Sequence, residues 1–245
     1  MMARFYFSFR SPYSWLAYRD LMARYPDVAE AVEWRPFWEP DEESRRLLAE
    51  ADGAFPYVDM SRAKALYILQ DVRRLTAGRG LRNAWPVDRA PCWEVAHLAY
   101  LVAREHDAGP RFIASVYRAR WEEGRDISDR ATIAAIGENL GLDPVALATA
   151  ADEPAVRREG LRALRAIDTD GVFGVPFFVQ GRDKYWGLDR LPDFVAAVRG
   201  KSPATKGATG TEPVLAFGPA GPGGDPGPGG DPWPGGDQGH AGGCG

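Results

Sequence analysis

Strand and helix patterns alternate at the start of the chain in an order that restricts the fold more than any other feature. Arg4–Phe9 is a short aromatic run typical of a buried strand, and the segment after it carries apolar residues at helical spacing. Ala29–Trp38 then has the pattern of a second strand. Since a strand–helix–strand unit forms a right-handed crossover between parallel strands, residues 1–40 predict two parallel neighbouring strands.

The middle of the chain has only helical patterns. Between about Asp41 and Asp168, apolar residues recur at helical spacing over segments separated by loops. Ser128 is the predicted N-cap of a helix that ends at Gly141, and Asp143 is predicted to open another short helix. The longer predicted helices cover Ser61–Leu75, Trp93–Arg104 and Pro110–Trp121.

Strand patterns return after this helical region. Val175–Gln180 and Lys184–Gly187 are predicted to be short strands joined by a turn, and Leu188–Arg199 to be a final helix. The order β-α-β, helical block, β-β-α predicts an α/β thioredoxin-like fold with an all-helical insertion after the second strand. Residues 1–200 would form one domain, with the thioredoxin-like part at about 1–40 and 170–200 and the insertion at about 41–168.

The segment after this domain has a different composition. Lys201–Gly245 contains 15 of the 28 glycines and 8 of the 20 prolines, which leaves few side chains to form a core. Glycine does not recur at every third position, so a collagen helix is excluded. We therefore expect this segment to be a disordered and functionally inert tail.

Charge and cysteine content exclude several functional classes. The chain has 30 basic and 34 acidic residues, and its net charge of −4 provides no general attraction to nucleic acids or anionic membranes. No apolar run is long enough to span a bilayer, and the N-terminus lacks the apolar segment of a secretory signal. Two cysteines and three histidines form no recognisable metal motif, so no metal is expected. These features favour a cytoplasmic protein that acts on a small molecule.

The Ser11-Pro12-Tyr13-Ser14 motif lies between the first predicted strand and the first predicted helix. A helix N-terminus concentrates unpaired N–H groups and partial positive charge, which stabilise an anion such as a thiolate. The hydroxyl of Ser11 could donate a hydrogen bond to that anion. Ser-Pro is also a common helix start, so capping alone explains the same residues.

Two further motifs lie near the end of the domain. Val175-Pro176 precedes a predicted strand, where a cis peptide bond would present the Val175 backbone to a peptide-like ligand. A proline at an edge strand or bulge is the alternative explanation. Asp189 is expected in the first turn of the final helix, where it could bind a ligand ammonium group or only complement the helix dipole.

Together these segments resemble a known family. FYFSFRSPYSWLA and GVFGVPFFVQGRDKYWGLDRL are similar to the 2-hydroxychromene-2-carboxylate isomerase family, which resembles kappa-class glutathione transferases and DsbA-type thioredoxin folds. The resemblance extends over about residues 4–198 and includes WEEGRDISD and SRAKALYILQDVRRL. It implies an isomerase that uses glutathione or another low-molecular-weight thiol as cofactor, and dimers are usual among such relatives.

The resemblance also implies roles for individual residues. Ser11 takes the position of the serine that contacts the glutathione sulfur, and Ser14 replaces the second cysteine of a redox pair, which excludes dithiol chemistry. Val175 and Pro176 match the cis-proline pair whose backbone holds the cysteinyl part of glutathione. The stretch that binds the γ-glutamyl end of glutathione in the family matches four consecutive residues of this chain, Trp186, Gly187, Leu188 and Asp189.

The predicted substrate-binding residues, Lys64, Trp85 and Asp88, depart from the family in part. Lys64 matches a basic residue near the substrate or glutathione, although a solvated helix lysine explains it equally well. Where the family often has Phe-Pro-Ile-Asn, this chain has Trp85 first and Asp88 last, so an anion replaces an amide and would repel a carboxylate substrate. Arg10 replaces an apolar residue before Ser11. We therefore expect the thiol-binding part of the site to be the same as in the family and the substrate-binding part to differ from it.

The implied reaction is the thiol-dependent isomerisation of an α,β-unsaturated carbonyl in an aromatic or polyketide-like small molecule. The thiolate adds to the double bond, the new single bond rotates, and expulsion of the thiol gives the isomer. If the thiol is not expelled, the product is a conjugate, as in a kappa-type glutathione transferase. A thiol-independent protein that binds or modifies a small aromatic molecule is the third hypothesis.

Overall fold

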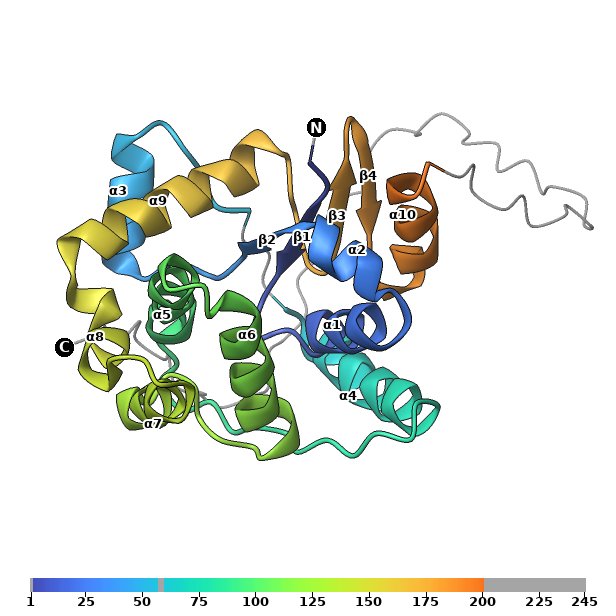
Figure 1. Ribbon diagram of the computed structural model, residues 1–245, viewed down its shortest axis with the longest axis horizontal. Coiled ribbons are helices and arrows are strands. Elements are labelled where there is room, and N and C mark those ends of the chain that lie inside the picture. Colours follow the sequence, from blue (N-terminus) through green and yellow to red (C-terminus); the bar gives the residue numbers. More distant parts are fainter. Residues whose placement is uncertain (1, 57–59, 201–245) are drawn as a thin grey trace, which may run out of the picture.

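A four-stranded mixed sheet lies at the centre of the described chain, which in this computed structural model comprises residues 2–56 and 60–200 (Figure 1). The strand order is β2-β1-β3-β4. β1 is parallel to β2 and antiparallel to β3, and β3 is antiparallel to β4. The strands are β1 (Arg4–Phe7), β2 (Glu33–Pro36), β3 (Phe177–Gln180) and β4 (Asp183–Trp186).

Helices connect and cover these strands. α1 (Pro12–Arg24) and α2 (Pro26–Ala31) link β1 to β2, and α10 (Leu191–Val198) follows β4 after the 3-10 turn η3 (Leu188–Arg190). All other helical segments lie between β2 and β3 in the sequence. They are α3 (Glu42–Glu50), α4 (Arg62–Ala77), α5 (Trp93–Glu105), α6 (Gly109–Tyr117), the π-helical η1 (Arg118–Glu122), α7 (Arg130–Leu140), α8 (Pro144–Ala148), the 3-10 turn η2 (Ala150–Asp152) and α9 (Pro154–Thr169).

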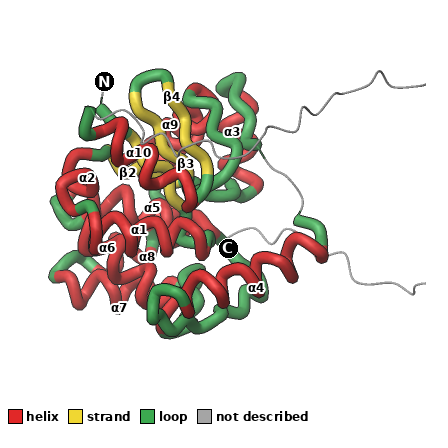
Figure 2. Tube along the Cα trace, turned by 90° about the vertical axis from the view of Figure 1, so that its right-hand side faces the viewer, coloured by secondary structure: helices red, strands yellow, loops and turns green. Residues whose placement is uncertain are grey.

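The helices form two groups around the sheet. α1, α2 and α10 lie at one side of the molecule, and α3 and α5 to α9 gather at the other side (Figure 1). α4 contacts α1 and extends away from the body of the molecule, as Figure 2 shows. The element order confirms the predicted α/β fold with a helical insertion after the second strand.

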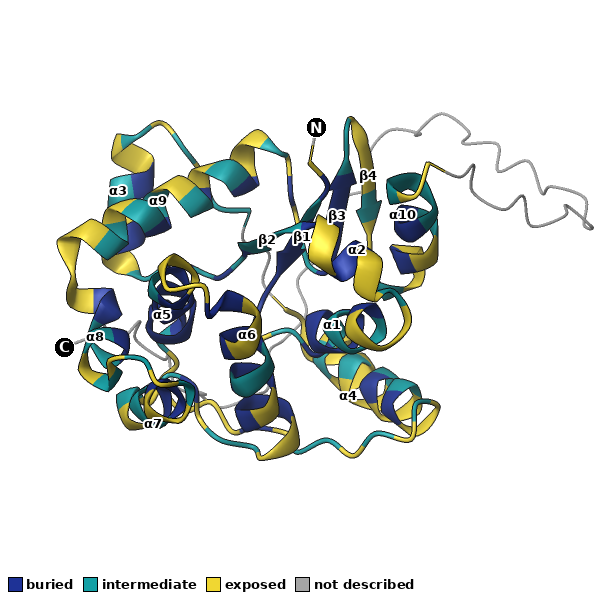
Figure 3. Ribbon diagram, viewed as in Figure 1, coloured by how far each residue is buried: buried dark blue, intermediate teal, exposed yellow. Residues whose placement is uncertain are grey.

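An aromatic cluster on β1 joins the sheet to the helical insertion. Phe7 is fully buried, and its ring packs edge-on against Tyr100 of α5 with centroids 5.3 Å apart. Phe5 stacks on Phe178 of β3 at 4.7 Å. Figure 3 shows buried residues along β1 and β3 and on parts of α1 and α5. Because burying one such side chain contributes about 1.5–3 kcal/mol, this cluster fixes the position of β1 and of the segment that follows it.

Several predicted elements differ from the structure at their ends, such as the predicted strand Val175–Gln180, which begins only at Phe177 in β3, and two of them also differ in the type of secondary structure. The first residues of the predicted strand Ala29–Trp38 belong to α2, because Pro26 starts a helix whose residues Val28 and Ala29 are buried. The predicted final helix Leu188–Arg199 begins as the 3-10 turn η3 and becomes α-helical only at Leu191. At both places the apolar pattern covers too few residues to show where a short helical turn ends and the neighbouring element begins.

The predicted cap of α7 is wrong. Asp129, not Ser128, caps this helix, with its Oδ1 accepting a hydrogen bond from the N–H of Ala131 at 3.0 Å. The Oγ of Ser128 instead accepts a hydrogen bond from the N–H of Cys92 at 3.0 Å. Both residue types are good N-caps, so the sequence does not separate them. The predicted end at Gly141 is confirmed, where φ is 73° and glycine avoids the strain of a Cβ.

The described segments contain no helix that is both long and apolar enough to cross a membrane. The predicted tail, Lys201–Gly245, lies outside the described residues. Residues 57–59, which precede α4, also lie outside them.

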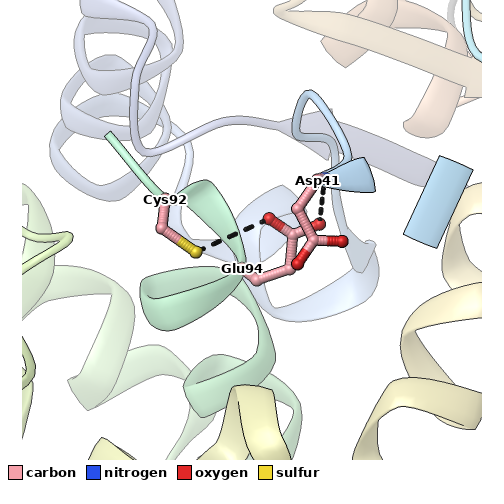
Figure 4. Close-up of side chains that lie close together, drawn as sticks. All are labelled: Asp41, Cys92 and Glu94. Carbon is pink, nitrogen blue, oxygen red and sulfur yellow. Dashed lines mark hydrogen bonds between the residues drawn. The ribbon is translucent and has the colours of Figure 1, made fainter. Parts of the chain in front are cut away.

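Glu94 of α5 is a buried carboxyl group next to Asp41 and Cys92 (Figure 4). Its Oε1 accepts hydrogen bonds from the Nε1 of Trp38 at 3.2 Å and from the N–H of Asp41 at 2.7 Å. The carboxylate of Asp41 binds the guanidinium of Arg157 at 2.9 and 3.2 Å. Both carboxyl groups therefore stabilise the fold through these contacts. Burial and the negative charge of Asp41 raise the pKa of Glu94 from 4.5 to about 7.

His97, one turn further along α5, is also buried. Its Nε2 accepts a hydrogen bond from the N–H of Phe9 at 3.2 Å, and its Nδ1 lies 2.7 Å from the carbonyl oxygen of Trp93. Burial lowers the pKa of His97 from 6.5 to about 3, so the folded chain keeps the ring neutral. The ring therefore holds the end of the β1 segment against α5 and is not a candidate acid or base.

These two shifts predict opposing contributions to the pH dependence of stability. Folded Glu94 keeps its proton up to pH about 7 whereas the unfolded chain loses it near 4.5, so this group lowers stability as pH rises through that window. The unfolded chain protonates His97 below pH 6.5 and the folded chain does not, so this group lowers stability as pH falls from 6.5 towards 3. In Glu94→Gln, the unfolding free energy should therefore rise from pH 4.5 to 6.5, whereas in the wild type the two effects offset each other. Urea unfolding at a series of pH values measures this, and identical profiles would contradict it.

Candidate functional site

Ser11 lies at the N-terminus of α1, where the chain leaves the β1 segment. Its Oγ accepts a hydrogen bond from the N–H of Ser14 at 3.2 Å, and Pro12 is the first helical residue, so the predicted helix start is confirmed. A serine hydroxyl has one proton and two lone pairs. The cap uses the oxygen as an acceptor and leaves the O–H able to donate to an anion. Capping and anion binding are therefore compatible roles for one side chain.

A cavity of about 720 Å³ lies beside α1, with walls formed by α1, α4 and the segments around β3 and β4. This volume is typical of small-molecule sites. Ser11 itself is not among the lining residues, whereas Tyr13 of the same helix turn is. The six other residues that the sequence analysis expects to bind the thiol cofactor all line the cavity: Val175, Pro176, Trp186, Gly187, Leu188 and Asp189.

The backbone around Val175 and Gly187 forms one wall of this cavity. The Val175–Pro176 peptide bond is cis, as the sequence analysis expects. The N–H of Gly187 donates to the carbonyl oxygen of Pro176 at 3.0 Å, which holds the two predicted binding segments together. Gly187 has a φ of 101°, and a Cβ there would lie 2.7 Å from the Oδ1 of Asp189, so only glycine fits. No described residue forms a backbone hydrogen bond to Val175, so an extended ligand can pair with it.

Charged groups of both signs line the cavity. The side chain of Asp189 is 75% exposed, and its contact with the Nε of Arg190 is long, at 3.7 Å, so the carboxylate can bind a ligand ammonium group. Arg24 of α1 contributes a positive charge to the wall. Asp20 and Arg79 neutralise each other through two hydrogen bonds of 3.0 and 2.7 Å. The sequence analysis did not identify these three residues, two of α1 and Arg79 just after α4, because single charged residues carry no local pattern.

Tyr13 and Asp71 connect α1 to α4 at the cavity wall. The hydroxyl of Tyr13 donates a hydrogen bond to the Oδ2 of Asp71 at 2.9 Å. Burial and this hydrogen bond raise the pKa of Tyr13 above its ordinary value, so the phenol stays protonated. The sequence analysis included Tyr13 only as part of its motif and missed Asp71, because the contact depends on how two helices pack.

Lys64 does not line the cavity. It is exposed on the first turn of α4, where its backbone N–H donates to the Oγ of Ser61 at 3.2 Å. Helical spacing places it on the same face as Tyr67 and Asp71, which do line the cavity, and nearer the helix N-terminus. A substrate-binding role for Lys64 stays a prediction.

Trp85 and Asp88 also lie outside this cavity, in the irregular segment between α4 and α5. The ring of Trp85 packs edge-on against Trp121 with centroids 5.5 Å apart. The carboxylate of Asp88 accepts two hydrogen bonds from the guanidinium of Arg120, at 2.9 and 2.8 Å. Asp88 is therefore an anion that is paired with Arg120, and its substrate-binding role and the expected repulsion of a carboxylate stay predictions. Arg120 was missed because nothing in its local sequence separates it from a solvated helix arginine.

Comparisons with known proteins identify relatives of this chain. The model of the DSBA-like thioredoxin domain family matches residues 3–199. The 2-hydroxychromene-2-carboxylate isomerase of Sphingobium xenophagum is 30% identical over 195 residues, which cover 78% of this chain and 94% of the relative.

Solved structures support the same fold. A 2-hydroxychromene-2-carboxylate isomerase structure matches with a TM-score of 0.64 at 23% identity and covers 82% of this chain and 95% of its own. The cytosolic disulfide reductase DsbM of Pseudomonas aeruginosa, solved with GSH, matches with a TM-score of 0.53 at 19% identity. That match covers 82% of this chain and 98% of the reductase. At these identities, the two structures establish the fold.

Proposed function

The chain belongs to the DSBA-like thioredoxin domain family and to the 2-hydroxychromene-2-carboxylate isomerases, and on this basis we propose that it is a thiol-dependent isomerase. Its substrate is an α,β-unsaturated carbonyl compound of aromatic or polyketide-like structure. Its cofactor is glutathione or a similar low-molecular-weight thiol. The observation that carries the proposal is the cavity lined by all six expected thiol-binding residues, with Tyr13 of the Ser11 motif in its wall.

Different residues of the cavity bind different parts of the thiol cofactor. Val175 binds the cysteinyl backbone through its own N–H and C=O, as a strand binds at a sheet edge. Asp189 binds the ammonium group, and its exposed carboxylate is suited to that role. Trp186, whose ring contacts Phe173 and is 55% exposed, covers the ligand chain at the surface. A reduced thiol is required, and we place the protein in the cytoplasm, where thiols are kept reduced.

Ser11 and the first turn of α1 promote the chemistry. The thiol supplies a sulfur nucleophile that adds to the double bond and later leaves, so no oxidant or reductant is needed. Ser11 donates its O–H to the sulfur anion, and the partial positive charge at the N-terminus of α1 stabilises that anion further. Both contributions favour the anion at neutral pH, on attack and again on departure. Tyr13, which stays protonated, keeps α1 and α4 together beside this position.

Two measurements test the proposal. Addition of glutathione to the protein near neutral pH should produce ultraviolet thiolate absorbance that free glutathione lacks at that pH. A cis enone should then return as its trans isomer with the thiol unconsumed. A stable conjugate would instead identify a kappa-type transferase. No thiolate signal with glutathione or with other small thiols would contradict the proposal and favour thiol-independent binding.

A further inference from the structure

We infer that Tyr67 of α4 is a catalytic residue, whose phenol O–H donates a hydrogen bond to the carbonyl oxygen of the substrate. The inference rests on the proposed function, which supplies the reaction, and adds the residue that stabilises a second anion in it. When the sulfur adds to the double bond, the carbonyl oxygen takes up the negative charge and an enolate forms. Ser11 serves the sulfur, so the enolate oxygen requires a donor of its own.

The neutral O–H donors in the wall of the cavity are three tyrosines, Tyr13, Tyr25 and Tyr67. The hydroxyl of Tyr13 already donates to Asp71 at 2.9 Å. Tyr25 is the C-cap of α1 and lies about 18 Å from Tyr13 along the helix axis, far from the helix start. Within residues 2–56 and 60–200, nothing accepts a hydrogen bond from the hydroxyl of Tyr67. Tyr67 therefore provides an unoccupied donor in this wall.

Contacts between α1 and α4 place Tyr67 close to the helix start. Tyr67 lies one helical turn before Asp71, so the two side chains are neighbours on one face of α4. Asp71 binds the hydroxyl of Tyr13, which belongs to the first turn of α1 and follows Ser11 by two residues. Arg74 supports this arrangement, because its Nη2 donates to the Oδ1 of Asp71 at 3.1 Å and its guanidinium carbon lies 5.8 Å from the ring centroid of Tyr67.

The side chain of Tyr67 is accessible to a ligand. It is 57% exposed, and it lines the same cavity as the expected thiol-binding residues Val175 and Asp189. A tyrosine offers apolar ring area to a flat conjugated compound and a hydrogen bond to its oxygen. Trp85 is exposed as well but lies outside this cavity. A substrate that contacts Tyr67 therefore shares one cavity with the sulfur of the bound thiol.

The reaction needs no further reactant at Tyr67. The sulfur–carbon bond forms while the C=C double bond becomes single, and the displaced electron pair moves to the carbonyl oxygen that accepts from Tyr67. Rotation about the new single bond follows. The oxygen then returns its electron pair, the C=C double bond forms again, and the sulfur–carbon bond breaks. The thiolate is regenerated, and Tyr67 keeps its proton throughout.

Tyr67→Phe tests this role because it removes only the hydroxyl of an exposed side chain. With glutathione and the probe cis-benzylideneacetone, both saturating, the variant should consume the enone about 10²–10³-fold more slowly. The same enolate precedes the isomer and a conjugate, so either product reports on Tyr67. The dissociation constant for glutathione and the thiolate titration should not change, which separates the role of Tyr67 from that of Ser11.

Tyr185→Phe is the matched control for this substitution. Tyr185 lies on β4, its ring contacts Phe194 with centroids 5.9 Å apart, and it is not part of the cavity wall. Its loss of a hydroxyl should leave the turnover number at the wild-type value. If Tyr25→Phe slows the reaction and Tyr67→Phe does not, the donor lies at the far end of the cavity and the inference is wrong.

A binding measurement tests the same hydrogen bond without turnover. The probe 4-nitrophenolate is a flat aromatic oxyanion that represents the enolate, and its visible absorbance reports its ionisation. At a pH where the probe is ionised, Tyr67→Phe should bind it about tenfold more weakly or worse than the wild type, because a hydrogen bond to a charged group is lost. Tyr185→Phe should bind it as the wild type does.

The two measurements separate the inference from the proposed function. Wild-type turnover in Tyr67→Phe, or equal binding of 4-nitrophenolate by both proteins, contradicts the inference. No binding of 4-nitrophenolate to the wild type contradicts it without any variant, and so does a loss of the thiolate signal in folded Tyr67→Phe. If the wild type gives the thiolate signal and consumes the enone while Tyr67→Phe does both equally well, the proposed function stands and only the role of Tyr67 is wrong. If the wild type lacks the thiolate signal, the proposed function fails and the inference fails with it.

Discussion

Replacing Ser11 by alanine is expected to lower the turnover number about 10²–10³-fold in a chain that remains folded. In the proposed mechanism the O–H of Ser11 donates to the sulfur anion, so its loss removes stabilisation of that anion on attack and on departure. The pKa of the bound thiol should rise for the same reason. The defect should persist at saturating thiol and substrate, because it affects the reaction step and not only binding. Steady-state kinetics and a pH titration of thiolate absorbance measure the two effects.

Ser11 is also a helix cap, and the experiment has to separate that role. Loss of an N-cap costs about 0.5–2 kcal/mol of stability. Ser61 provides the matched control, because its Oγ caps α4 by accepting the N–H of Lys64 at 3.2 Å, the same distance as in the Ser11–Ser14 cap. Ser61→Ala should lower the melting temperature and leave turnover and thiolate titration unchanged. If Ser11→Ala behaves in the same way, Ser11 is only a helix cap. Thiol-independent binding of a small molecule then becomes the better hypothesis for the function.

Asp189→Asn is expected to raise the KM for glutathione by on the order of tenfold to a hundredfold without changing the turnover number at saturating thiol. A hydrogen bond to a charged group contributes about 1.5–3 kcal/mol, and each 1.4 kcal/mol is a factor of ten. The carboxylate of Asp189 lies at the cavity wall and is 75% exposed, so salt should weaken the effect. Kinetics at low and at physiological ionic strength measure it.

Two comparisons make this prediction specific. Asp193→Asn removes a carboxylate from the following helical turn, which contacts Arg190 and is not part of the cavity wall, so KM should not change. Glutathione that lacks its amino group should bind the wild type and Asp189→Asn equally well. If Asp189→Asn weakens the binding of both thiols to the same extent, its role is structural and the ammonium group binds elsewhere.

The strand and helix order could be predicted because it depends on local patterns. The aromatic run at β1, the Ser11–Pro12 helix start and the glycine at position 141 each follow from the conformational preferences of neighbouring residues. The wrong predictions concern positions at which two alternative local structures have nearly equal free energy. Ser128 and Asp129 are both good caps, and tertiary contacts of Ser128 with Cys92 settled which one is used.

The expected thiol-binding residues meet because of the sheet topology. β1 pairs with β3 through Phe5 and Phe178, and β3 pairs with β4. These pairings place the Val175–Pro176 bond and the Gly187 turn near the start of α1, and their residues share one cavity wall with Tyr13. The sequence analysis assigned these distant motifs to one site from the family resemblance, and the strand order is the physical reason why they meet.

The sequence by itself determined the fold class, the position of Ser11 at a helix start and six of the residues that line the cavity. Only the tertiary structure decided how charges are distributed around the site. Arg120 neutralises Asp88, Tyr13 binds Asp71, and Glu94 is buried beside Asp41, so its pKa is raised. The physical reason is that secondary structure follows preferences within a few residues, whereas the charge and hydration of an ionisable group depend on which distant side chains pack against it.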